Sequence, residues 1–199
     1  MRDGLPEMHS RSLAQAIVSV VGDIFHHFQL YIGARDDQSI DRAYVVTADS
    51  VEHVLGRPAR KNLSQALVTN YLMRPGERFI PLARQQLFME ALGASSGDGK
   101  SRGRIGVDFG SVGLCHVAAG FSDAMIEFAK GFAIWDLAPS HYILHAAGGI
   151  VTDLLGTPIP LDYRLDSLAN IVGAMNRRQR FIAAADATLA NEILRTLNV

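Results

Sequence analysis

Cysteine is nearly absent from this chain, since Cys115 is the only one among 199 residues. A lone cysteine excludes an intramolecular disulfide, which fits a reducing compartment. Hydrophobic runs are also short, and none approaches the roughly 18 residues that cross a bilayer. Residues 1–8 lack the apolar segment of a signal peptide. We therefore expect a cytoplasmic protein with no membrane partner.

Charge of one sign is not in excess either, because 19 Lys and Arg against 20 Asp and Glu give a net charge of −1. Neither a nucleic-acid partner nor a polybasic membrane surface is indicated. Phosphate-loop, serine-hydrolase and dinucleotide fingerprints are missing from the sequence. His141 and His145 have the spacing of zinc ligands on a helix, but no third ligand is signalled. We interpret them as packing or surface histidines.

The first part of the chain, residues 1–62, is rich in β-branched and aromatic residues. Short apolar runs separated by turn residues predict strands. We expect a hairpin of strands 14–21 and 25–32 that turns at Gly22 and Asp23, followed by strands 43–48 and 51–55.

Residues 63–199 alternate between the two kinds of pattern. The predicted strands are 66–69, 104–107, 123–128, 150–152, 170–173 and 180–184. The predicted helices are 79–92, 111–119, 137–147 and a last one, capped by Asp186, that runs through Leu197. This order predicts an α/β protein in layers, with an antiparallel sheet packed beside a mixed α/β layer. No linker separates the two parts, so we expect residues 1–199 to form a single compact unit.

Asp136 is the strongest candidate for chemistry. It follows Trp135 and precedes the predicted helix 137–147, which Gly148 and Gly149 end. An aspartate there can simply cap the helix. Its carboxylate is also the hard oxygen ligand that Mg²⁺ prefers, together with water and substrate phosphate.

Three shorter patterns accompany Asp136. Glu127 follows an Asp-Ala pair on a predicted strand, and Ser111 follows Gly110 at a predicted helix start. Near the beginning of the chain, Asp3 is followed by Gly4 and Leu5. Each pattern also has an ordinary structural interpretation: an exposed strand end, a packing helix of small residues and a solvated terminus.

Taken together, these segments resemble the inositol monophosphatase family, most closely over residues 120–158. The resemblance implies a layered αβαβα sandwich of which this chain holds the later part, as an N-terminally truncated member. It implies that Asp136 and Asp3 bind Mg²⁺, with Asp136 at the catalytic metal. It further implies that the Gly4 and Leu5 backbone holds phosphate and that Ser111 and Glu127 meet the substrate.

The activity implied is Mg²⁺-dependent hydrolysis of a phosphomonoester, either inositol phosphate or a related sugar or nucleotide phosphate. The family's upstream Glu-Glu pair and first aspartate are missing from this sequence, so we expect this chain alone to be weak or inactive. The alternative is a non-catalytic pseudoenzyme or gene fragment that acts as an interaction subunit. A third interpretation is that the protein shares only the fold of the family and binds another anionic metabolite. Family members are commonly homodimers, which the resemblance therefore implies here too.

Overall fold

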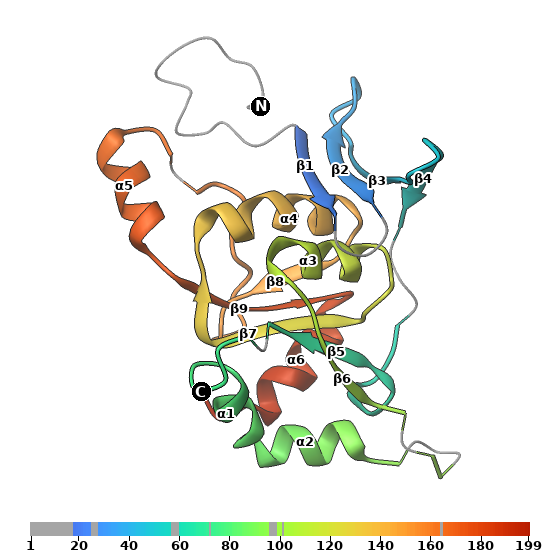
Figure 1. Cartoon of the computed structure of the whole chain (residues 1–199), viewed down its shortest axis with the longest axis vertical. Coiled ribbons are helices and arrows are strands. Elements are labelled where there is room, and N and C mark those ends of the chain that lie inside the picture. The colour runs from blue at the N-terminus through green and yellow to red at the C-terminus, as the bar shows by residue number, and fades with distance from the viewer. Residues whose placement is uncertain are drawn as a thin grey trace.

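The chain folds into stacked sheets and helices, as Figure 1 shows. This computed structural model describes residues 18–24, 28–56, 60–71, 73–95, 99–100, 102–163 and 165–199. Two sheets enclose one pair of helices, and further helices cover the far face of the larger sheet. The predicted α/β class, an antiparallel sheet beside a mixed layer, is confirmed.

The smaller sheet is antiparallel throughout, in the order β1-β2-β3-β4. Its strands are β1 (Val18–Asp23), β2 (Gln29–Arg35), β3 (Asp41–Val46) and β4 (Glu52–Leu55). The predicted turn at Gly22 and Asp23 is wrong, because both residues lie in β1, opposite Leu30 and Gln29. Asp23 is fully buried against the pair of helices between the sheets. That tertiary contact keeps Gly22 and Asp23 in the strand, although Gly-Asp is a typical turn sequence.

The larger sheet is mixed, in the order β6-β5-β7-β9-β8. Its strands are β5 (Leu67–Asn70), β6 (Arg104–Val107), β7 (Ala124–Phe132), β8 (Ile150–Thr152) and β9 (Gln179–Ala184). β5 runs parallel to both β6 and β7, whereas β9 runs antiparallel to β7 and β8. The chain segments that leave β6 and β7 therefore emerge at the same edge of the sheet.

The helices are α1 (Phe79–Ala83), α2 (Gln86–Gly93), α3 (Gly110–Ala118), α4 (Ile134–Ala146), α5 (Leu168–Asn176) and α6 (Ala187–Thr196), with a 3₁₀ turn at Leu63–Gln65. Asp186 caps α6 as predicted, by accepting hydrogen bonds from the backbone N–H groups of Thr188 and Leu189. No helix among the described residues is long and apolar enough to cross a membrane.

The single helix predicted over 79–92 is wrong, because the structure breaks it between α1 and α2. Gln85 has a non-helical backbone there, with φ −85° and ψ 71°. Its side chain accepts a hydrogen bond from the Asn198 N–H at 2.8 Å and donates one to the Asn198 carbonyl at 3.3 Å. A contact with the far end of the chain thus accompanies the break, and helical spacing alone could not reveal it.

The strand predicted over 170–173 is also wrong, because these residues lie within α5. Ser167 caps this helix, and its side chain accepts from the Asn170 N–H. Short apolar runs are compatible with either a helix or a strand, and the Ser167 cap favours the helix. Figure 1 shows α5 projecting from the body of the fold.

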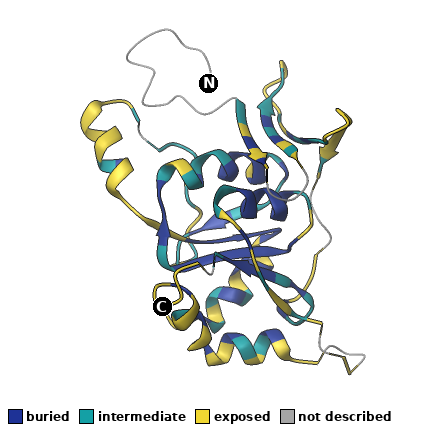
Figure 2. Cartoon of the chain, viewed as in Figure 1, coloured by how far each residue is buried: buried dark blue, intermediate teal, exposed yellow. Residues whose placement is uncertain are grey.

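Two hydrophobic clusters hold the layers together, and Figure 2 shows the burial. The first lies around α3 and α4 between the sheets and includes Tyr31, Leu114, Cys115, Ile143 and Phe181. The second lies beneath the larger sheet against α2 and α6 and includes Val68, Phe88, Ile126, Ile182 and Ile193. Burial raises the pKa of the Cys115 thiol, which fits a packing role.

A buried polar contact joins the smaller sheet to α3. His116 Nδ1 lies 2.9 Å from an Asp108 carboxylate oxygen, and Nε2 lies 3.4 Å from one of Asp23. Burial alone would lower the pKa of His116, but its hydrogen bonds and charge interactions with Asp108 and Asp23 outweigh burial and raise it. The protonated imidazole therefore stabilises the packing of β1 against α3.

We predict that this contact makes stability depend on pH. A raised histidine pKa contributes stability that is present below about pH 6.5 and is lost as the pH rises through the folded-state pKa. His116→Gln should therefore lower the free energy of unfolding more at pH 6 than at pH 9, measured by denaturant titration. The exposed His53→Gln is the control. An equal loss at both pH values in His116→Gln would contradict the prediction.

Candidate active site

The candidate site lies where α3 and α4 begin, at the edge of the larger sheet reached by the ends of β6 and β7. The Ser111 hydroxyl donates a hydrogen bond to the Asp136 carbonyl at 2.5 Å, which ties the first turns of the two helices together. The Ser140 hydroxyl donates to the same carbonyl at 3.2 Å. The structure therefore brings together two of the residues that the sequence singled out, Ser111 and Asp136.

Neither of these helix starts is capped by a side chain. The capping positions are Phe109 for α3 and Ala133 for α4, and neither makes a side-chain capping bond. The first backbone N–H groups of a helix have no partner within the helix, and together with the helix dipole they attract anions. Two such ends side by side form a positive pole at this edge of the sheet.

Asp136 lies inside the first turn of α4, so its predicted place just ahead of the helix is wrong. The helix starts earlier because the N–H groups of Asp136 and Leu137 both donate to the Ala133 carbonyl at 3.1 Å. The Asp136 side chain is half-buried. Among the described residues, no hydrogen bond to its carboxylate is found, so its oxygens can accept a ligand.

Two arginines act on the Asp136 carboxylate at a distance. Burial raises the pKa of Asp136, while the charges of Arg178 and Arg78 oppose that rise. The Arg178 guanidinium lies 5.7 Å from the centre of the Trp135 ring, which places it beside the first turn of α4. The site thus combines the open Asp136 carboxylate with the charges of two nearby arginines and with two helix N-termini.

Glu127 is fully buried, so the interpretation of an exposed strand end is wrong. One of its carboxylate oxygens lies 2.5 Å from Arg78 Nε, and the other accepts from the backbone N–H groups of Lys130 and Gly131. The register between β7 and β9 shifts after Glu127, where Gly131 has a φ of 82°. Glu127 therefore holds both the irregular end of β7 and the Arg78 side chain.

Arg78 and Arg178 are the site residues that sequence reasoning missed. Arg78 follows a Pro-Gly turn without any periodic signal, and its guanidinium lies 4.8 Å from the centre of the Tyr71 ring. Arg178 belongs to a basic run, Arg177-Arg178-Gln179-Arg180, that leads into the last strand. That run was the available signal, because β9 is antiparallel to β7, so the residues that lead into β9 lie at the edge of the sheet where β7 ends.

The predicted residues Asp3, Gly4 and Leu5 lie outside the described part of the chain. Within that part, no three His, Cys, Asp or Glu side chains gather into a metal site. His141 Nδ1 lies 2.7 Å from the Tyr163 hydroxyl, and burial lowers the pKa of His141 to about 4, as befits a packing histidine. One open carboxylate fits a Mg²⁺ ion shared with substrate phosphate, and it does not fit a cage of protein ligands alone.

The fold and the site define a layered α/β protein in which two helix N-termini meet beside an open carboxylate. A family model described as the inositol monophosphatase family matches residues 19–197. This chain belongs to the inositol monophosphatase family. The implied sandwich fold is confirmed by solved structures of that family.

The relatives are matched over only part of their own length. Human inositol monophosphatase 2 is 35% identical over 85 residues, which are 43% of this chain and 27% of that protein. A fructose-1,6-bisphosphatase/inositol-1-monophosphatase of Methanothermobacter thermautotrophicus is 35% identical over 86 residues, again 43% and 27%. The structure of an inositol monophosphatase from Anabaena superposes with a TM-score of 0.53 at 20% identity. That superposition covers 92% of this chain and 58% of the Anabaena chain, so this chain spans only part of its relatives.

We predict that Arg78 is needed for stability because it neutralises a buried charge. Arg78→Met should lower the free energy of unfolding by about 3–5 kcal/mol, since it leaves the Glu127 carboxylate buried without its cation. The double change Arg78→Met with Glu127→Leu should recover much of that loss. Arg74→Met, which removes a guanidinium from the exposed pair with Glu77, is the matched control and should have little effect. A small loss in Arg78→Met, measured by denaturant titration, would contradict this role.

Proposed function

We propose that this protein binds the phosphate of a small phosphomonoester at the joined starts of α3 and α4 and hydrolyses it with Mg²⁺. The observation that carries the proposal is the pairing of two uncapped helix N-termini with one open carboxylate, Asp136. Backbone N–H groups and the Arg178 charge suit the phosphate. Because one carboxylate is a small ligand set, we expect weak or absent turnover from this chain alone.

Each residue has a role in this proposal. Asp136 would hold Mg²⁺, with Asp3 as the second predicted ligand and the Gly4 and Leu5 backbone on the phosphate. Bound Mg²⁺ supplies charge neutralisation and lowers the pKa of a coordinated water. Ser111, on α3, holds the first turn of α4 in place through its hydrogen bond to the Asp136 carbonyl.

Glu127 enters the proposal in two ways. Direct contact with a substrate hydroxyl stays a prediction. Its partners in the fold assign it a supporting role, because its carboxylate holds Arg78 at the edge of the site.

We further propose an inositol phosphate or a related sugar or nucleotide phosphate as the substrate. Support comes from the names of its relatives, which include inositol monophosphatases and a fructose-1,6-bisphosphatase/inositol-1-monophosphatase. A cytoplasmic location and a homodimer complete the proposal. The lone buried thiol of Cys115 is consistent with that location.

The test is phosphate release from inositol phosphate and a panel of phosphomonoesters, with Mg²⁺ and with EDTA. Where the wild-type chain shows Mg²⁺-dependent turnover, Asp136→Asn should lower it at least about 100-fold, which corresponds to about 2.7 kcal/mol of transition-state stabilisation. Asp37→Asn changes an exposed carboxylate outside the site and should leave turnover unchanged. Turnover that persists in EDTA and in Asp136→Asn would sink the proposal.

A second candidate function is supported by the outer face of the smaller sheet. Val20, Leu30 and Val54 on this face are 53%, 47% and 68% exposed. Figure 2 shows exposed residues along these strands, while their other face packs on α4. An apolar sheet face of this kind marks an interaction surface, so the alternative is a non-catalytic subunit that is covered by another polypeptide.

We predict that this face promotes self-association when no partner covers it. Wild-type protein should form larger species as its concentration rises, and the double variant Leu30→Lys with Val54→Lys should shift it toward monomer. Sedimentation velocity measures the distribution. Leu155→Lys, at an 87% exposed leucine elsewhere, is the control. A wild-type protein that stays monomeric at all concentrations would remove the support for this candidate.

A further inference from the structure

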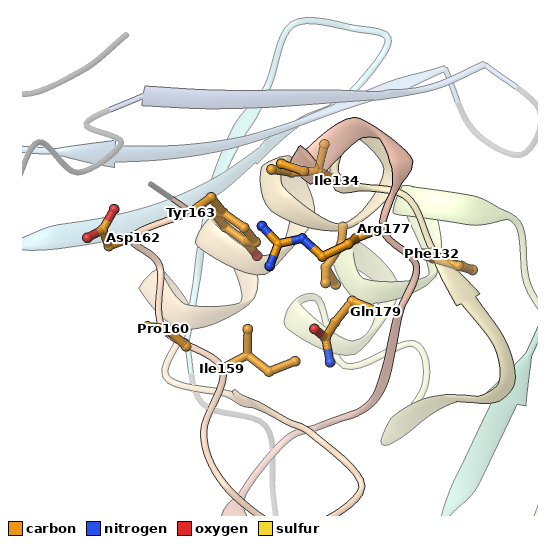
Figure 3. Close-up of a pocket in the computed structure, with 10 residues that line it drawn as sticks. Phe132, Ile134, Ile159, Pro160, Asp162, Tyr163, Arg177 and Gln179 are labelled. Atoms are coloured by element: carbon orange, nitrogen blue, oxygen red, sulfur yellow. The ribbon is translucent and has the colours of Figure 1, made fainter. Parts of the chain in front are cut away.

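A separate cavity of about 340 Å³ lies on the other flank of α4 from Asp136. Ile134 and Leu137 line it, and helical geometry turns these two residues away from Asp136. The remaining walls come from the end of β7, the segment 159–163, α5 and the connection from α5 into the start of β9. Figure 3 shows these elements around one hollow. The cavity therefore adjoins the first turn of α4, but Asp136, Ser111 and Arg178 are not among the residues that line it.

Most of the wall is apolar. Ile134, Leu137 and Ile159 form a surface on which a ring or branched chain can pack. The volume falls within the roughly 300–1,000 Å³ typical of small-molecule sites. This part of the cavity favours a compact apolar body over a polyhydroxylated sugar, whose hydroxyls would lose their hydrogen bonds to water.

Arg177 supplies the positive charge at this cavity. Its Nε donates to the Gly173 carbonyl at 3.3 Å, and Figure 3 shows its terminal nitrogens directed into the hollow beside Tyr163. The Tyr163 hydroxyl is engaged with His141, so the tyrosine presents its ring face to the cavity. The carboxylate of Asp162, also at this cavity, points away from the centre in Figure 3.

We propose that this cavity binds a small acid, with one carboxylate on Arg177 and an apolar ring against the Ile134 and Leu137 wall. A guanidinium pairs with a carboxylate through two parallel hydrogen bonds, which fixes the orientation of such a ligand. The ligand would contact the helical turn that carries Asp136, so occupancy would steady that turn. The proposal does not depend on phosphatase activity.

Two probes of matched shape test the charge requirement. 2-Naphthoate carries the carboxylate, whereas 2-naphthalenemethanol is its neutral counterpart, and equilibrium dialysis measures both. We expect naphthoate to bind at least tenfold more tightly than the alcohol, and Arg177→Gln to remove that difference without weakening the alcohol. Arg180→Gln is an exposed arginine control that should change neither. Naphthoate affinity that is equal in wild type and Arg177→Gln would overturn the proposal.

A second variant tests the location. Ala174 lines the cavity and is 5% exposed, so Ala174→Leu should fill part of the space and weaken both probes about tenfold or more. Met175→Leu, which places a leucine on the exposed side of α5 without filling the cavity, is the control. If both probes bind Ala174→Leu as they bind wild type, then they lie elsewhere, for example on the outer face of the smaller sheet, and the proposal fails.

Discussion

Parallel pairing of β5 with β6 and with β7 is the constraint on which the site depends. Parallel strands release the chain at one edge, so α3 and α4 have to start beside each other, and the Ser111 hydroxyl can then bond the Asp136 carbonyl. The capping residue of neither helix makes a side-chain capping bond, and the positive ends of both helix dipoles meet at this edge. The proposed phosphate site therefore depends first on backbone topology, which brings the two helix N-termini together, and only then on charged side chains.

The charged side chains then divide into two groups. Glu127 and Arg78 neutralise each other within the fold, and Glu127 also holds the backbone at the bulge of β7. Asp136 and Arg178 remain at the boundary with solvent, where a ligand can reach them. A phosphate with a metal ion matches that second pair, because it brings negative charge to the arginine and a cation to the carboxylate.

The smaller sheet has one covered face and one exposed face, and this chain spans only part of the length of its relatives. One face packs on α3 and α4 through residues such as Tyr31 and Val45, and the other is apolar and exposed. The chain matches only 58% of the Anabaena structure's length. A sheet that is apolar on both faces is stable when both faces are covered. A polypeptide that covers the exposed face is compatible with the phosphatase proposal and is required by the interaction-subunit alternative.

The sequence by itself determined the elements whose signals are local. Residues 104–107 and 150–152 form the strands that their apolar runs predict, and Asp186 caps the last helix, because such signals act within a few residues. Its motifs also indicated the family, and they singled out Ser111 and Asp136 for a shared site. Only the tertiary structure decided what depends on distant partners. Asn198 contacts the break at Gln85, a buried Asp23 extends β1 through a turn signal, and Arg78 finds Glu127 across 49 residues of chain. These features depend on burial and on contacts between segments that are far apart in the sequence, so no local sequence pattern could predict them.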